Sequence, residues 1–327
     1  MLLSAMVAVV AAAATARPVA SIVPGLTAPT LPQLPVPLPP LPVPLPPLPV
    51  PLPLPGPTPP VEAPAGVEAY RGLGTWVDVF DWSLAYTNGR PATTPDDVDR
   101  MAALGVRTLY IQAARHDGPD GVLEPERLRG FLDRAAARGM NVVPWYLPSL
   151  VDPGRDLQRL KAIAALPHVD AIGVDIESRD VADPGERSRR LVSLSSSLRR
   201  ELPGRTIGAI VLPAVVLDVV NTRYWPGFPY RELAGSYDVW LPMSYWTNRT
   251  SASGYRDAYR YTRENVDRLR AHLGRPDALV HPIGGIGDRT DAGDVDGYRR
   301  AVSDTGGIGT SLYDWRTTGA QLWHHLR

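Results

Sequence analysis

The feature that most constrains this chain is a regular alternation of short and long apolar patterns after Gly66. Short runs rich in β-branched and aromatic residues are separated by longer stretches in which apolar residues recur at helical spacing. Eight runs predict strands: Trp76–Asp81, Thr108–Gln112, Asn141–Tyr146, Ala171–Glu177, Thr206–Leu212, Val239–Trp246, Leu279–Ile283 and Gly309–Asp314. Eight strands alternating with helices in roughly 260 residues predict an α/β fold of the (β/α)8 barrel type.

The stretches between these runs support the barrel. In one of them Leu128, Phe131, Leu132 and Ala135 form a helical stripe that Gly139 closes. The main alternative is an open, doubly wound sheet. It is disfavoured because no glycine-rich phosphate loop follows the first predicted strand.

The chain before this region has a different composition. Residues 2–16 form an apolar run that ends in Ala-Thr-Ala, which is typical of a secretory signal and short for a membrane span. The proline-rich stretch that follows contains LPVPLPP twice and predicts an extended polyproline II spacer. We therefore expect a signal peptide or N-terminal anchor at 1–16, a disordered linker at 17–66 and one barrel at 67–327, in a secreted or cell-wall-associated protein.

Composition excludes several classes of function. The 34 basic and 34 acidic residues balance, which argues against nucleic acid, or a membrane beyond the possible anchor, as the main partner. The absence of cysteine excludes disulfides, thiolate catalysis and cysteine-bound zinc. The six histidines show no metal-ligand spacing. We expect neither a metal nor a cofactor.

Two carboxylates stand out on the predicted strand Ala171–Glu177. Isoleucine and valine alternate there with Gly173, Asp175 and Glu177. Because a strand sends alternate side chains to opposite faces, both acids should face the barrel axis, roughly 7 Å apart. They fall at the carboxyl end of the strand, where active sites of such barrels lie. Adjacent buried acids raise one pKa, which suits a general acid. The alternative is that one acid pairs with a core arginine.

Other strand ends carry acidic and aromatic residues that could form a sugar-binding cleft, because sugar rings pack their C–H faces on flat aromatic rings. The expected substrate-binding residues are Asp78, Asp81, Trp145, Tyr146, Met243, Trp246, Asp314 and Trp315. Each aromatic residue taken singly could be a core residue. Their coincidence with the acid pair favours a site.

The segment DAIGVDIE at 170–177 resembles the strand-4 signature of family 18 glycoside hydrolases, Asp-Gly-x-Asp-x-Asp-x-Glu. Met243-Ser244-Tyr245 resembles that family's Met-x-Tyr on strand 6, and Trp315 falls where the family has its strand-8 tryptophan. The resemblance implies that Glu177 is the general acid and that Asp175 orients a substrate N-acetyl group acting as internal nucleophile. It also implies that Tyr245 binds this group and that Trp315 forms the floor under the distorted sugar.

The resemblance has limits that can be read from the residues. Gly173 replaces the middle aspartate of the signature, the family's early Ser-x-Gly-Gly motif is absent, and Trp246 follows Tyr245 where aspartate is common. Segments such as Trp145–Pro148 and His281–Asp288 are similar to those of uncharacterised exported actinobacterial proteins. The resemblance therefore implies the superfamily more strongly than the reaction.

Three functions remain open from the sequence. The first is an exported glycoside hydrolase that cleaves a cell-wall or environmental polysaccharide or oligosaccharide by carboxylate acid/base catalysis, with Asp78 as one possible nucleophile. The second is a catalytically degenerate barrel that binds carbohydrate or serves as a cell-wall scaffold. The third is a hydrolase of another bond that uses Ser244 and His281. A phosphate site at the Gly284–Asp288 loop is a further, weaker possibility.

Overall fold

The computed structural model describes residues 65–119 and 121–327. The expected signal or anchor at 1–16 and all but the last two residues of the expected linker lie outside the described residues. Within the described part, every helix is too short or too polar to cross a bilayer.

The strands form one parallel sheet in the order β7-β6-β5-β4-β3-β2-β1-β9-β8. Their bounds are β1 (Gly72–Val77), β2 (Thr108–Gln112), β3 (Asn141–Tyr146), β4 (Ile172–Ile176), β5 (Ile207–Val211), β6 (Val239–Pro242), β7 (Leu279–Val280), β8 (Ile283–Ile286) and β9 (Gly309–Tyr313). Each of β1 to β6 pairs with the next strand along the chain, and β1 also pairs with β9.

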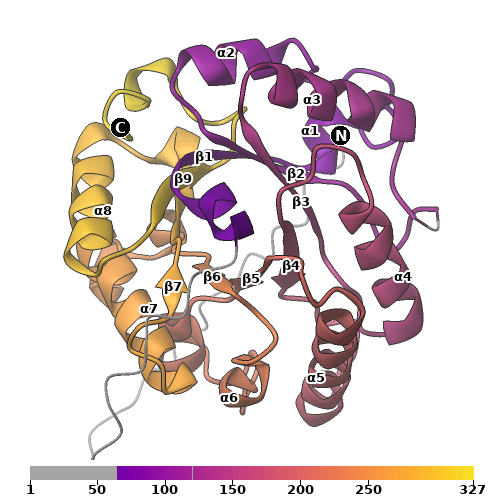
Figure 1. Ribbon diagram of the computed structural model, residues 1–327. Coiled ribbons are helices and arrows are strands. Elements are labelled where there is room, and N and C mark those ends of the chain that lie inside the picture. Colours follow the sequence, from indigo (N-terminus) through magenta and orange to yellow (C-terminus); the bar gives the residue numbers. More distant parts are fainter. Residues whose placement is uncertain (1–64, 120) are drawn as a thin grey trace, which may run out of the picture. The chain divides into compact units, whose positions relative to one another are not determined.

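Segments β7 and β8 together make the seventh strand of a closed barrel. β7 pairs with β6 and β8 pairs with β9, while His281 and Pro282 separate the two segments. A parallel bridge joins Met243 to Ile283, and the Ser244 amide donates to the Ile283 carbonyl at 2.8 Å. Figure 1 shows the resulting ring of strands surrounded by helices. The predicted (β/α)8 architecture is confirmed.

The helices follow the strands and cover the outside of the ring (Figure 1). They are α1 (Val79–Trp82), α2 (Asp97–Ala103), α3 (Pro125–Ala137), α4 (Pro153–Ala164), α5 (Pro184–Glu201), α6 (Tyr230–Leu233), α7 (Ala258–Leu273) and α8 (Ala292–Asp304). Local sequence sets several of their starts, because aspartates cap α4, α5, α7 and α8 and proline opens α3, α4 and α5. The predicted stripe on α3 is buried.

Aromatic rings fill the interior of the barrel. Trp76 stacks on Tyr110 with ring centroids 4.2 Å apart, and Trp145 meets Trp76 edge-on at 6.1 Å. Gly74 makes room for this stack, because a side chain there would overlap the Tyr110 ring. The inside of the barrel is therefore a packed core and leaves the ends of the strands to carry a site.

A short 3-10 helix, η1 (Ala65–Tyr70), closes the amino end of the barrel. It is the darkest indigo turn at the centre of the ring in Figure 1. The Tyr70 hydroxyl donates to the Ile172 carbonyl at 2.6 Å, and Thr108 donates to the Ala69 carbonyl at 2.8 Å. The folded barrel thus includes Ala65 and Gly66, which the sequence assigned to the linker.

Candidate active site

The acid pair lies at the carboxyl end of β4, as predicted. A Cβ on Gly173 would lie 3.0 Å from Trp145 and 3.1 Å from Ile210, so this face of the strand points into the barrel. Asp175 and Glu177 follow at two-residue steps on the same face. Asp175 is 7% exposed, and its Oδ1 has no hydrogen-bond partner among the described residues.

Burial changes the charge of this pair. Burial, and next the negative charge of Glu177, raise the pKa of Asp175 well above its usual value. Burial also raises the pKa of Glu177. Two negative charges side by side are unfavourable where little water reaches them. The pair therefore keeps one proton to a higher pH than exposed carboxyl groups do. A retained proton is what a general acid needs.

Tyr245 follows β6 and faces the same acids. Burial raises its pKa first, and the charges of Glu177 and Asp175 raise it further, with smaller effects from Asp314 and Asp78. The Tyr245 phenol therefore lies within electrostatic reach of four carboxylates and stays protonated. It can donate a hydrogen bond to a ligand held between them.

A second group of acids comes from β1 and β9. Carboxylate oxygens of Asp78, Asp81 and Asp314 lie within 4.8 Å of one another. Burial and then the charges of Asp78 and Asp314 raise the pKa of Asp81 to about 8. The Arg316 Nε lies 2.7 Å from Asp81 and acts in the opposite direction. Arg316 is about half exposed, so water screens it, and burial with two neighbouring acids outweighs it.

Local structure at the end of β1 explains this group. The strand runs over Gly72–Val77 and not over Trp76–Asp81 as predicted, and the helical turn α1 follows it directly. Asp78 caps α1 by accepting a hydrogen bond from the Phe80 amide at 2.8 Å. The turn carries Asp81 to a fully buried position beside β9, where three carboxylates could serve a hard cation as ligands. Residue spacing did not indicate this cluster, because Asp314 lies more than 230 positions along the chain from Asp78 and Asp81.

Tyr313 is the site residue that the sequence analysis missed. Its hydroxyl donates to Asp78 Oδ2 at 2.8 Å, and its ring lies 5.7 Å from that of Tyr245. A signal for it existed in the alternation of β9. Ser311 bonds inside the barrel, so Tyr313 two residues later shares that face.

Two predicted site residues lie elsewhere. Trp315 packs against Trp323 with centroids 5.3 Å apart, and its indole N–H donates to Asp97 of α2 at 3.4 Å. The expected floor tryptophan therefore points toward the helices, because β9 ends at Tyr313 and its alternation stops there. Tyr146 is fully buried, and its hydroxyl bonds Asp156 of α4.

Trp246 is also a core residue. It is fully buried next to Tyr298, at 5.4 Å, and its ring lies against Gly284 and Gly285, where a Cβ would come within 3.1 and 2.8 Å. These glycines belong to strand β8, so close packing explains the glycine pair that suggested a phosphate loop. The expectation from the sequence that Trp246 binds substrate in a sugar-binding cleft therefore does not fit its position.

The remaining candidates are nearly enclosed by protein. Trp145 and Met243 are each 5% exposed, Trp145 in the interior and Met243 at the bridge to Ile283. Ser244 and His281 are fully buried and bond other partners: Ser244 accepts from Asn265 at 3.3 Å. A serine hydrolase built on these two residues is therefore contradicted.

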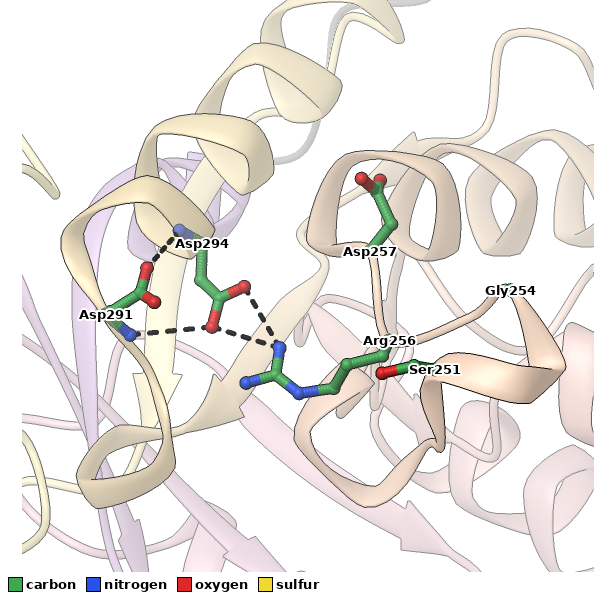
Figure 2. Close-up of a pocket in the computed structure, with 6 residues that line it drawn as sticks. All are labelled: Ser251, Gly254, Arg256, Asp257, Asp291 and Asp294. Carbon is green, nitrogen blue, oxygen red and sulfur yellow. Dashed lines mark hydrogen bonds and ion pairs between the residues drawn. The ribbon is translucent and has the colours of Figure 1, made fainter.

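An open cleft of about 500 Å³ lies at the starts of α7 and α8 (Figure 2). Arg256 donates to both carboxylate oxygens of Asp294 at 3.0 Å, and Asp291 and Asp294 cap α8 reciprocally. These polar groups satisfy one another, as the dashed lines in Figure 2 show. The lining includes none of the carboxylates at the ends of β1, β4 and β9.

Comparison with known proteins shows which solved structures share the fold of this chain. No family model and no curated protein matches the sequence. Among solved structures, a class V chitinase from Pseudomonas fluorescens superposes with a TM-score of 0.58 at 10% identity, covering 78% of this chain and 98% of the other. The spore cortex-lytic enzyme SleL of Bacillus cereus gives 0.58 at 10% identity, covering 78% and 73%. An endo-β-1,4-mannanase from Thermotoga petrophila gives 0.54 at 12% identity, covering 75% and 68%.

These neighbours are TIM-barrel glycoside hydrolases, and at such identities the similarity shows a shared fold. The distant resemblance to family 18 in the sequence fits this result. The three neighbours are named for three different substrates, so the fold leaves the substrate of this chain to be argued from its own site.

Proposed function

We propose that this protein is a glycoside hydrolase that cleaves a glycosidic bond in a polysaccharide or oligosaccharide. The observation that carries the proposal is the buried pair of Asp175 and Glu177 at the carboxyl end of β4, in which burial raises both pKa values. Glycoside hydrolysis requires an acid that keeps its proton near neutral pH and a second carboxylate close to it. The glycoside hydrolase barrels that share the fold support the same proposal.

In this proposal Glu177 donates its proton to the glycosidic oxygen as the sugar–oxygen bond breaks. Asp175 stabilises the positive charge that develops on the sugar, directly or through a substrate N-acetyl group. Tyr245 and Tyr313 hold the sugar from the side of β6 and β9, where their rings lie 5.7 Å apart. Water then attacks the anomeric carbon and gives up a proton to Glu177, which restores the acid.

We further propose that the protein acts outside the cytoplasm on a cell-wall or environmental glycan. The apolar run at 2–16 and the proline-rich stretch after it support this proposal, because such segments export and space a domain. Neither segment lies within the described residues.

A carbohydrate-binding scaffold is the second candidate. It is favoured by the enclosure of Asp175 and by the large cleft that the acid pair does not line. Against it, Glu177 forms no ion pair with any described residue, so its carboxyl group is not committed to a structural role.

The test compares the full-length wild type with Glu177→Gln for sugar release from chitin oligomers, peptidoglycan, arabinogalactan and α- and β-glucans. We expect release from one substrate class and a loss of at least about 100-fold in the variant, which is the usual contribution of a general acid. Glu232→Gln, an exposed substitution on α6, is the matched control and should leave the rate unchanged. A folded wild type that binds a glycan yet releases nothing would support the scaffold instead.

A further inference from the structure

Two arginines lie on the β4 side of the barrel mouth, the end at which the carboxyl ends of the strands meet. Neither forms an ion pair with a described carboxylate. Arg179 follows Glu177 by two residues and is exposed. Its guanidinium lies 5.0 Å from the Tyr224 ring, and no carboxylate in residues 65–119 and 121–327 forms an ion pair with it. Arg187, in the first turn of α5, is 2% exposed and lies 4.5 Å from the Trp225 ring.

Arg187 forms no ion pair with any described carboxylate, and its hydrogen bonds go to the backbone. The guanidinium donates to the backbone carbonyls of Val181, Ala182 and Tyr224 at 2.9, 3.3 and 3.4 Å. Buried guanidinium groups are normally paired with carboxylates. Burial, and next the nearby charge of Arg179, lower the pKa of Arg187, and Tyr224 and the charge of Asp183 oppose this more weakly. The two positive charges are thus close enough to disfavour each other.

Tyr224 connects this positive region to the acid pair. Its hydroxyl donates to the backbone carbonyl of Glu177 at 3.3 Å, while Arg179 lies over its ring. Burial raises the Tyr224 pKa, the charge of Glu177 raises it further, and the charges of Arg179 and Arg187 oppose this. One tyrosine ring therefore lies within reach of both arginines and of the proposed acid.

Acidic residues near Arg179 are engaged elsewhere. Asp183 caps α5 by accepting from the Glu186 amide, and Asp180 lies 3.7 Å from His116. An anion from outside the protein would supply the missing counter-charge, since a guanidinium binds carboxylate, sulfate and phosphate oxygens with a matching fork of donors.

We propose that Arg179, with Arg187 behind it, binds an oxyanion carried by a sugar unit of the substrate, so that the enzyme prefers an anionic glycan over its neutral counterpart. This inference rests on the proposed glycosidase function and adds the substrate class. The charged unit lies on the β4 side, because Arg179 offers an exposed guanidinium there that forms no ion pair with a described carboxylate. Carboxylate, sulfate and phosphate esters share the required chemistry.

The test measures glycan binding by calorimetry with full-length Glu177→Gln protein, in which substrate stays intact. The probes are oligosaccharides that carry carboxylate, sulfate or phosphate groups, each with an uncharged counterpart such as the carboxyl-reduced form. We expect one anionic probe to bind at least tenfold more tightly than its neutral counterpart, with an affinity that falls as salt rises. The responding probe identifies the oxyanion.

Adding Arg179→Gln should remove this preference by weakening binding of the anionic probe, whereas Arg179→Lys should keep part of it. Arg300→Gln on α8 is the matched control, because Arg300 is also exposed and lies over a tyrosine ring at 4.4 Å, and it should have no effect. Equal affinity for charged and neutral probes, or an unchanged preference in Arg179→Gln, would overturn the inference while leaving glycan cleavage intact. Absence of glycan cleavage by the wild type, together with absence of glycan binding by Glu177→Gln, would instead overturn both proposals.

Discussion

The interior of the barrel and its mouth treat buried polar groups in opposite ways. In the interior the Trp76 indole donates to Ser311 at 3.0 Å, and Ser311 donates to Nε2 of His281 at 2.9 Å. Nδ1 of His281 in turn donates to the Tyr70 carbonyl at 2.7 Å. Burial lowers the His281 pKa to about 4, so this chain of hydrogen bonds carries no charge at neutral pH.

At the mouth the polar groups are charged or nearly so, and they are crowded. Asp175 lacks a partner for Oδ1, and the pKa of Asp81 is raised to about 8. At neutral pH each raised carboxyl pKa lowers the stability of the folded state, a cost that the uncharged hydrogen-bond chain through His281 does not carry. The hydrogen-bond chain of the interior is paired and neutral, whereas the mouth holds acids in a form that chemistry can use.

The largest expected effect on stability comes from removing a side chain at the centre of the barrel interior. Trp76→Ala should lower the free energy of unfolding by about 3–5 kcal/mol, because it empties the place of a buried ring stacked on Tyr110. Denaturant unfolding followed by circular dichroism measures this loss. Trp315→Ala, at a half-buried tryptophan, should cost clearly less. Equal losses would break the contrast between the packed interior and the strand ends.

The next effect tests the cost at the mouth. The folded-state pKa of Asp175 is raised above its unfolded value, so the folded state holds a proton that the unfolded chain releases, and wild-type stability falls as pH rises above about 4. Asp175→Asn removes this penalty. We expect the two proteins to have similar free energies of unfolding at pH 4 and the variant to be more stable by about 2 kcal/mol at pH 8.

Denaturant unfolding at pH 4, 6 and 8 gives these values. The exposed Asp277→Asn provides the matched control, whose difference from wild type should not grow with pH. A constant difference for Asp175→Asn across the range would show that the mouth carries no such cost.

The smallest effect concerns the closed end of the barrel. Tyr70→Phe removes one buried hydrogen bond, to the Ile172 carbonyl, so we expect a loss of about 1 kcal/mol. Because no change of charge is involved, this loss should be the same at pH 4 and pH 8. A pH-dependent loss in the same unfolding experiment would remove the distinction between the two regions.

Much of the fold could be predicted because parallel strands are buried on both faces and read as compact apolar runs. β2 and β3 have the bounds that the sequence predicts, and the inward face of β4 follows from simple alternation. The acid pair was predictable for the same reason: Asp175 and Glu177 interrupt an apolar pattern at a fixed step of two residues.

The rest of the site depends on where strands stop, and local pattern does not reveal this. β1 ends at Val77, so Asp81 moves into a helical turn, and β9 ends at Tyr313, so Trp315 leaves the barrel face that Tyr313 keeps. Contacts between distant segments were equally hidden. The cluster of Asp78 and Asp314 and the docking of Tyr70 under the barrel both join residues more than a hundred positions apart.

The closing helix η1 has a consequence for the order in which the molecule can form. It is the first described element of the chain, yet its hydrogen bonds join Tyr70 to residues 102 and 211 positions later. A chain emerging from the ribosome must wait for both partners before this end can seal, and the closure of such long loops is slow. Until then the aromatic interior is exposed at the amino end of the barrel. Exposed aromatic rings favour association with other chains or with chaperones.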